Sequence, residues 1–232
     1  MINSPTVPPV IRRTFDRNMG AFLRPGDPTP PDNQRAIRPA QQVFSLGLEP
    51  LSQSQSIRDS AAAANWRFLM AATAGSGLYA TVTRHDDEAP EFTGLARGAP
   101  AAIAVQADQD VRKLPAAQSE DYNLSVLAIP GLLTEAFWLK WVAPGGKESD
   151  PARDLIVPFV TAQKQLMPMH PYTVEEFTRI AAPLAKKKLQ SFKRLEEESQ
   201  GRVKQQQAAA QEKRNAWRAL ARAPEPPRAK PV

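Results

Sequence analysis

YNLSVLAIPGLLTEAFWLKWV, residues 122–142, is the most informative stretch of this 232-residue chain. Two runs within it, 122–129 and 134–142, are rich in apolar and β-branched side chains and have the length of strands. The dipeptide Pro130-Gly131 separates the runs and predicts a turn or a bulge, because such pairs interrupt regular structure. The stretch therefore predicts two consecutive strands of an antiparallel sheet.

Alternation along the second run indicates which of its side chains share a face. Successive side chains of a strand point to opposite faces of the sheet. Phe137 and Trp141 therefore share one face, whereas Trp138 and Lys140 share the other. We expect one of the two tryptophans to face the core, where its replacement by alanine would cost about 3–5 kcal/mol.

Further elements flank this pair on both sides. Residues 66–73 and 78–84 surround a glycine-containing turn and predict a hairpin. Residues 154–160 predict another short strand, and Pro158 within it favours a place near the sheet edge. A helix is expected over 101–113. The fold class that follows is α+β, with an antiparallel sheet of about five strands and one or two helices on a face.

Several of these hydrophobic runs resemble those of a group of small uncharacterised bacterial proteins. The resemblance extends over residues 65–180, and the runs that carry it are 66–69, 124–132, 136–139, 155–158 and 172–177. It implies a bacterial or phage origin and an α+β core. No activity is known for the group, so the resemblance implies no catalytic residue.

Proline content sets the first 55 residues apart. Residues 1–50 hold nine of the 23 prolines, and proline both fixes φ and lacks a backbone N–H donor. We therefore expect neither a long helix nor an interior strand there, and we interpret residues 1–55 as a Pro-rich extended arm. Phe15, Phe22 and Phe44 are its expected anchors on a protein partner, because an extended segment can dock in a neighbour's groove.

Aromatic residues and charge divide the rest of the chain into two more regions. The aromatic side chains concentrate in residues 56–185, which we expect to form an independent α+β core. Residues 186–232 contain 13 Lys and Arg against 5 Asp and Glu, so this region is more basic than the whole chain at +6. Thr173 and Glu176 form a capping-box pattern that predicts the start of a long C-terminal helix.

The C-terminal helix offers two alternative binding functions. An apolar stripe is expected to pack on the core as far as Leu195, with Pro183 predicting a kink or restart, and the helix ends in a Pro-rich segment. Apolar anchors dominate protein contacts, and the anchors here would be Phe192, Leu195 and Trp217. Nucleic acid would instead require cations against phosphates. The candidate cations for that alternative are Lys186, Lys187, Lys188, Lys193 and Arg194.

The composition disfavours several other classes of protein. Cysteine is absent and only two histidines occur, so we expect no thiolate chemistry and no metal site. Residues 85–88 with Glu91 form the densest titratable cluster, but its spacing matches no metal or acid–base motif, and we interpret it as a solvated turn. We therefore expect no catalytic residue and no cofactor. No apolar run approaches the roughly 18 residues of a membrane span.

These patterns favour a non-enzymatic structural or interaction protein of a bacterial or phage assembly, attached through its arm and C-terminal helix. The alternative is a nucleic-acid-binding accessory protein that uses the basic tail. The first residues lack the basic and apolar segments of a secretory leader, so a cytoplasmic location, or assembly into a virion or particle, is expected.

Overall fold

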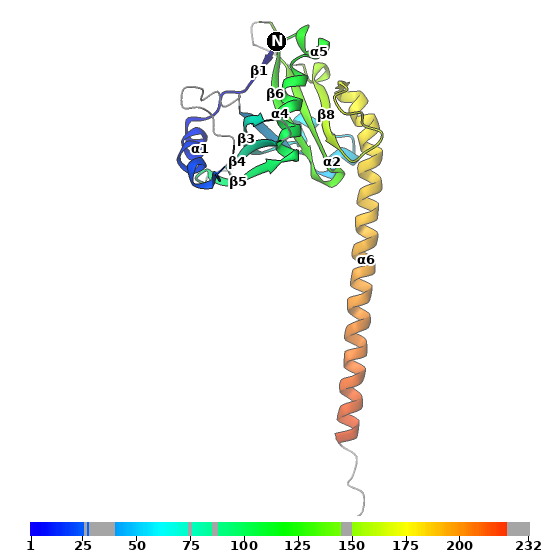
Figure 1. Cartoon of the computed structure of the whole chain (residues 1–232). Coiled ribbons are helices and arrows are strands. Elements are labelled where there is room, and N and C mark those ends of the chain that lie inside the picture. Colours follow the sequence, from blue (N-terminus) through cyan, green and yellow to red (C-terminus); the bar gives the residue numbers. More distant parts are fainter. Residues whose placement is uncertain (26, 28–39, 74–75, 85–87, 145–149, 222–232) are drawn as a thin grey trace, which may run out of the picture. The chain divides into compact units, whose positions relative to one another are not determined.

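The computed structural model describes residues 1–25, 27, 40–73, 76–84, 88–144 and 150–221 (Figure 1). It shows an α+β fold in which helices pack on a mixed nine-stranded sheet. The strands are β1 (Ile2–Asn3), β2 (Gln41–Ser45), β3 (Ala62–Thr73), β4 (Ser76–Thr83), β5 (Glu91–Gly98), β6 (Tyr122–Ile129), β7 (Thr134–Trp141), β8 (Leu155–Thr161) and β9 (Tyr172–Thr173). The helices are α1 (Pro9–Phe22), α2 (Leu48–Ser52), α3 (Ile57–Ser60), α4 (Ala99–Val111), α5 (Pro115–Gln118) and α6 (Val174–Ala221), with short 3-10 turns η1 (Pro130–Leu132) and η2 (Pro151–Arg153).

The sheet is larger than the sequence predicts and not wholly antiparallel. Its order is β5-β4-β3-β2-β6-β7-β8-β9. Strand β2 pairs antiparallel with β3 but parallel with β6, and β1 also runs parallel to β6. The expectation of about five antiparallel strands missed β5, because its sequence EFTGLARG contains two glycines and little apolar alternation. Strands β1, β2 and β9 are short or lie among prolines.

Three local expectations are confirmed. The β3–β4 hairpin forms, with Phe68 opposite Ala80. Residues 122–129 and 134–141 form the pair β6–β7 around η1. Helix α4 begins beside Pro100, where the missing N–H of proline costs no intrahelical hydrogen bond.

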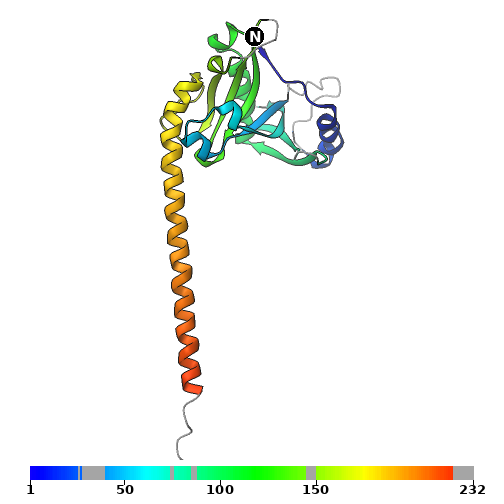
Figure 2. The ribbon, with the colours of Figure 1, turned by 180° about the vertical axis from the view of Figure 1, so that it is seen from behind.

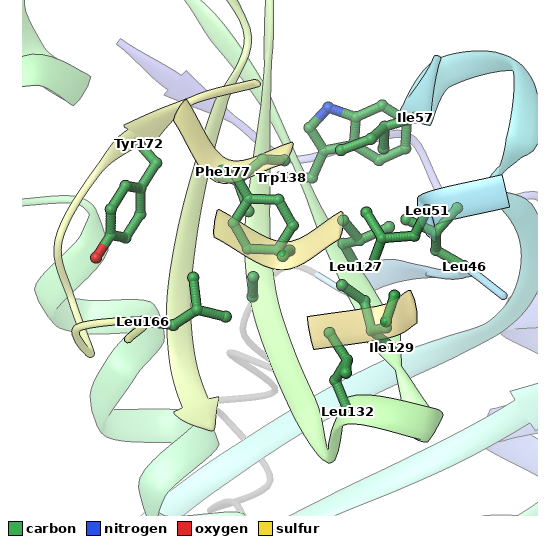
Figure 3. Packing of buried hydrophobic residues seen from close by; sticks show 14 residues of the cluster. Leu46, Leu51, Ile57, Leu127, Ile129, Leu132, Trp138, Leu166, Tyr172 and Phe177 are labelled. Carbon is green, nitrogen blue, oxygen red and sulfur yellow. The ribbon is translucent and has the colours of Figure 1, made fainter. Parts of the chain in front are cut away.

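Both faces of the sheet are covered, which follows from the alternation along β7. Phe137 and Leu139 pack with Ala104 and Val105 of α4 on one face (Figure 1). Trp138 faces the other way and is 1% exposed. On that side α2, α3 and the first turns of α6 close the core, as Figure 3 shows for the side chains around Phe177. Trp138 is thus the buried tryptophan of the pair, and Trp141 is half-buried.

The first 55 residues are not an extended arm in the structure. Residues Pro9–Phe22 form helix α1, whose Phe15 is buried and stacks on Phe68 with ring centroids 4.2 Å apart. Residues Gln41–Ser45 form β2, an interior strand between β3 and β6. The expectation of no long helix and no interior strand is therefore wrong. The prolines lie outside these elements, except Pro9, which occupies the first turn of α1 where proline is tolerated.

Helix α6 begins as the sequence predicts and then departs from the expectation. The Thr173 backbone N–H donates to Glu176 at 2.9 Å, and the Glu176 N–H donates to the Thr173 hydroxyl at 3.2 Å, which completes the capping box. The helix continues through Pro183 without a restart. Burial ends at Ala185 rather than at Leu195, which is 60% exposed.

The chain divides into two compact units, Met1–Lys188 and Leu189–Val232. The first contains the whole sheet and helices α1 to α5, seen from the opposite side in Figure 2. The boundary of the first unit thus falls within helix α6. Among the described residues, no helix has the length and apolar character needed to cross a bilayer.

Candidate functional site

A cleft of about 650 Å³ opens on the first compact unit, beside the start of helix α6. Its walls are the segment from Ser54 through α3, the turn η2, and the first turns of α6. Trp138 and Asp154 line it together with Arg58. The lining thus combines apolar surface with fixed charges, the usual composition of a binding cleft.

Asp154 is fully buried and accepts hydrogen bonds from three residues. The Arg58 guanidinium donates from Nε at 2.9 Å and from Nη2 at 2.6 Å. The Trp138 indole N–H donates at 2.9 Å, and so does the Trp141 backbone N–H. Because both carboxylate oxygens are saturated with donors, Asp154 fixes Arg58 and Trp138 in place and is not arranged as a proton acceptor for a substrate.

Local sequence signals shape the two walls of the cleft. On one side, Ser54 has φ of +54° and closes helix α2, because the Gln55 N–H donates to the Pro50 carbonyl and the Ser54 N–H to the Leu51 carbonyl. This is the hydrogen-bond pattern of a Schellman motif, which explains the left-handed residue without invoking a functional strain. On the other side, the capping box of α6 orients its first turns.

Arg179 and Glu175 supply the remaining charges of the lining. Among the described residues, neither forms an ion pair with a protein side chain. Two positive and two negative side chains therefore line the cleft in total, and its formal charge is balanced. The arrangement suits binding rather than acid–base chemistry, because no nucleophile lies hydrogen-bonded to a base there.

Lys140 lies next to this cluster on the same face of β7 as Trp138. Its Nζ is 3.6 Å from the centroid of the Phe44 ring and 4.0 Å from that of Trp138. Burial lowers the pKa of Lys140 to about 8, with Arg58 acting in the same direction and Asp154 opposing it. Burial dominates because the ammonium loses water while no described carboxylate pairs with it directly. Sequence reasoning missed both Lys140 and Asp154.

The expected anchors of the first 55 residues have three different environments. Phe15 is a core residue, so its assignment as a docking anchor is corrected. Phe44 is half-buried and meets Trp138 edge-on at 5.3 Å. Phe22 is 47% exposed, although its ring stacks on Phe92 at 4.7 Å. Of the three, Phe22 offers most surface to a partner.

The expected anchors of the C-terminal helix remain on the surface where they are described. Phe192 is 46% exposed and Leu195 is 60% exposed. The side chain of Trp217 lies outside the described residues. Val203, which is 49% exposed, belongs with the other two. The signal for it was the spacing of 11 residues from Phe192, about three helical turns.

The five candidate cations of this helix are all exposed, but they do not belong to one compact unit. Lys186, Lys187 and Lys188 end the first unit, and Lys193 and Arg194 belong to the second. Arg194 donates to Glu198 at 2.9 Å, so part of its charge is neutralised one turn along the helix.

The titratable cluster at 85–88 lies mostly outside the described residues, since 85–87 are not described. Within the described part of the chain, no three or more His, Asp or Glu side chains are arranged to hold a metal ion. The chain matches no protein-family model, no curated protein and no solved structure. Its function must therefore be argued from its own geometry.

Proposed function

We propose that this protein is a non-enzymatic structural or interaction protein that attaches to a protein partner through its C-terminal helix. The observation that carries the proposal is the exposure of Phe192, Leu195 and Val203 on the second compact unit. Large apolar side chains grouped within a few turns of one helix are typical of a helix that docks in a partner's groove. Residues 189–214 are otherwise polar, as a helix exposed between binding events requires.

The first compact unit supplies a rigid body for this attachment. Its sheet is covered on both faces, and Asp154 locks α3 to β7 through Arg58 and Trp138. Attachment through an arm is reduced to Phe22, because Phe15 and much of Phe44 pack inside this unit. The helix is thus the main attachment element of the proposal.

The setting we propose is a bacterial or phage assembly, located in the cytoplasm or built into a virion or particle. The support for it is the resemblance of the runs at 124–132 and 136–139 to those of small bacterial proteins. Minor structural components of this kind commonly combine one folded body with a helical attachment segment.

A nucleic-acid-binding accessory function is the second candidate, and one observation favours it. Lys186, Lys187, Lys188, Lys193 and Arg194 are exposed within little more than two helical turns. Against it, the run of glutamates at 196–198 follows directly, and Arg194 is paired with Glu198. Acidic residues within a phosphate-binding surface weaken it by repulsion.

Two sets of substitutions in the full-length protein separate these functions. The apolar set changes Phe192, Leu195 and Val203 to alanine, and the charge set changes the five candidate cations to glutamine. We expect the apolar set to remove a specific co-purifying protein from a native lysate, because buried anchors dominate protein contacts, while the charge set removes less. Circular dichroism of each variant verifies that the helix is retained.

The opposite outcome supports nucleic acid and contradicts the proposal. Binding to duplex DNA would then weaken steeply with salt, with a log–log slope of about −0.9 for each neutralised phosphate, and the charge set would flatten that slope. The apolar set would leave it unchanged. Nuclease treatment of the lysate before purification serves as the control for indirect capture through nucleic acid.

A further inference from the structure

Charges of opposite sign are separated around the exposed stretch of helix α6, residues 189–214. Helix α6 is uninterrupted here, so successive residues advance by about 100° around its axis. Relative to Phe192, Val203 lies about 20° away and Leu195 about 60° away, so the three apolar side chains form one stripe. We call these three residues the apolar stripe.

Basic residues border the apolar stripe on both sides. Lys193, Arg202, Lys213 and Arg214 lie within about 100° of Phe192, and Glu196 is the acidic residue of this stretch that lies among them. The opposite side carries Glu197, Glu198 and Glu212 together with Arg194 and Lys204. The ion pair between Arg194 and Glu198 therefore belongs to the side that faces away from the stripe.

This distribution specifies the charge of the partner. Side chains that flank the apolar seam between two helices choose the partner by charge, because they lie opposite its own flanking residues. Cations occur on both flanks here, with Lys193 and Arg214 on one and Arg202 and Lys213 on the other. A second copy of the same helix would place cations against cations in either orientation, which disfavours self-association.

The stripe is also too interrupted for a lipid surface. Ser199 and Gln206 lie within about 40° of Phe192, between the apolar residues, and Glu196 borders them. An interfacial membrane helix requires a continuous apolar face. A protein groove can instead satisfy a serine or glutamine side chain with hydrogen bonds.

We propose that residues 189–214 dock against an acidic amphipathic helix of a partner protein, with the apolar stripe at the centre and Lys193, Arg202, Lys213 and Arg214 pairing with carboxylates at its edges. The inference rests on the proposed function, because it names the kind of protein that the C-terminal helix binds. It excludes a second copy of this chain and it ranks phosphate and lipid surfaces below an acidic helix.

Two synthetic helical peptides of about four heptads each serve as probes. Both carry leucine along one seam, and they differ only in the residues flanking it, glutamate in the acidic peptide and lysine in the basic peptide. Fluorescence anisotropy at about 0.15 M salt measures their affinity for the full-length protein. We expect the acidic peptide to bind at least about tenfold more tightly, because like charges repel across the flanks.

Two double variants test the position of the charges at equal net charge. The flank pair is Arg202→Glu with Arg214→Glu, and the outer pair is Arg194→Glu with Lys204→Glu. Each replaces two cations by two glutamates, and circular dichroism verifies the helix. We expect the flank pair to weaken binding of the acidic peptide by about tenfold or more and the outer pair by less than about threefold.

Each other outcome overturns either the inference or the function beneath it. Equal losses for the flank and outer pairs, no binding of the acidic peptide, or tighter binding of duplex DNA or anionic phosphatidylglycerol vesicles would overturn the inference. The variant Phe192→Ser with Val203→Ser reports on the function separately. If it abolishes binding of both peptides while the flank pair has no special effect, the proposed function stands and the inference falls. If it leaves binding of the acidic peptide unchanged, the proposed function falls.

Discussion

Asp154 illustrates how one residue can connect elements that are far apart in the sequence. Its carboxylate accepts from Arg58, 96 residues away, and from Trp138 and Trp141 on the neighbouring strand. The side chain is fully buried, and Arg58 is 22% exposed. A buried charge pair of this kind contributes little net stability compared with an apolar pair, but it is costly to break, because the remaining charge stays desolvated.

Replacing Asp154 by asparagine should destabilise the protein by about 3–5 kcal/mol, because Arg58 is left without its anion. Urea unfolding followed by tryptophan fluorescence measures the loss. The matched control is Asp16→Asn, which breaks an exposed ion pair with Arg12 and should cost less than about 1 kcal/mol. Similar losses for both variants would show that the Asp154 cluster does not hold α3 to β7.

Lys140 gives the stability of the protein a specific pH dependence. Burial lowers its pKa from 10.5 to about 8, so between these pH values the unfolded chain binds a proton that the folded chain does not. Stability therefore rises with pH through this window, and the cost of the buried ammonium is fully present below pH 8.

The variant Lys140→Met isolates this effect, because methionine keeps most of the apolar contacts with Phe44 and Trp138 without a charge. We expect it to be more stable than the parent near neutral pH, and the difference should shrink as the pH rises towards 10.5. Urea midpoints across this range measure it, with the exposed Lys164→Met as the control. A constant difference across the range would contradict the lowered pKa.

At the scale of elements, helix α4 approaches strand β4 closely at a glycine. A Cβ on Gly77 would overlap the backbone of Ala101 and Ala102, and it would lie 2.6 Å from the Cα of Ala102. Both residues belong to the first turn of α4, so backbone rather than a flexible side chain fills the space. The absence of a side chain at this position is what allows the helix to pack on the sheet there.

Gly77→Ala should therefore displace α4 and cost about 3 kcal/mol, the upper range for overpacking. Gly94→Ala is the matched control, because it also lies in an antiparallel strand and a Cβ there meets nothing within 4 Å. We expect a change of less than about 0.5 kcal/mol for that variant. Thermal unfolding compares the two, and equal effects would show that the approach of α4 does not depend on Gly77.

At the scale of the whole molecule, the folding unit begins earlier and ends earlier than the sequence suggests. Strand β2 lies between β3 and β6, so it joins the two halves of the sheet. The first compact unit ends at Lys188, and Phe192 and Leu195 beyond it are exposed. The second unit can therefore be removed at little cost, whereas the first 55 residues cannot.

Two fragments test this division. Residues 1–188 should fold and melt within a few degrees of the full chain, because they keep every described strand. Residues 56–195 should lack a native near-ultraviolet circular dichroism spectrum, because they lose β1, α1 and β2. Folding of 56–195 with a cooperative transition would show that the sheet tolerates the loss of its interior strand.

Much of the local structure was predictable because it depends on interactions between near neighbours. The alternation at 122–129 and 134–141, the hairpin around Phe68 and the capping box at Thr173 all follow from side-chain spacing and hydrogen bonds within a few residues. The apolar stripe of the C-terminal helix was visible for the same reason. Its exposure was not, because spacing alone does not show where a packing surface ends.

The sequence by itself thus determined the strands of the central hairpins, the faces of β7 and the start of helix α6. The tertiary structure alone decided that Val43 and Phe44 lie in an interior strand, since that strand is stabilised by pairing with residues about 80 positions later. It also decided that Phe15 is core and that Asp154 meets Arg58. The physical reason is that pairing across a sheet and burial of a charge depend on the packing of the whole domain, which no short stretch of sequence encodes.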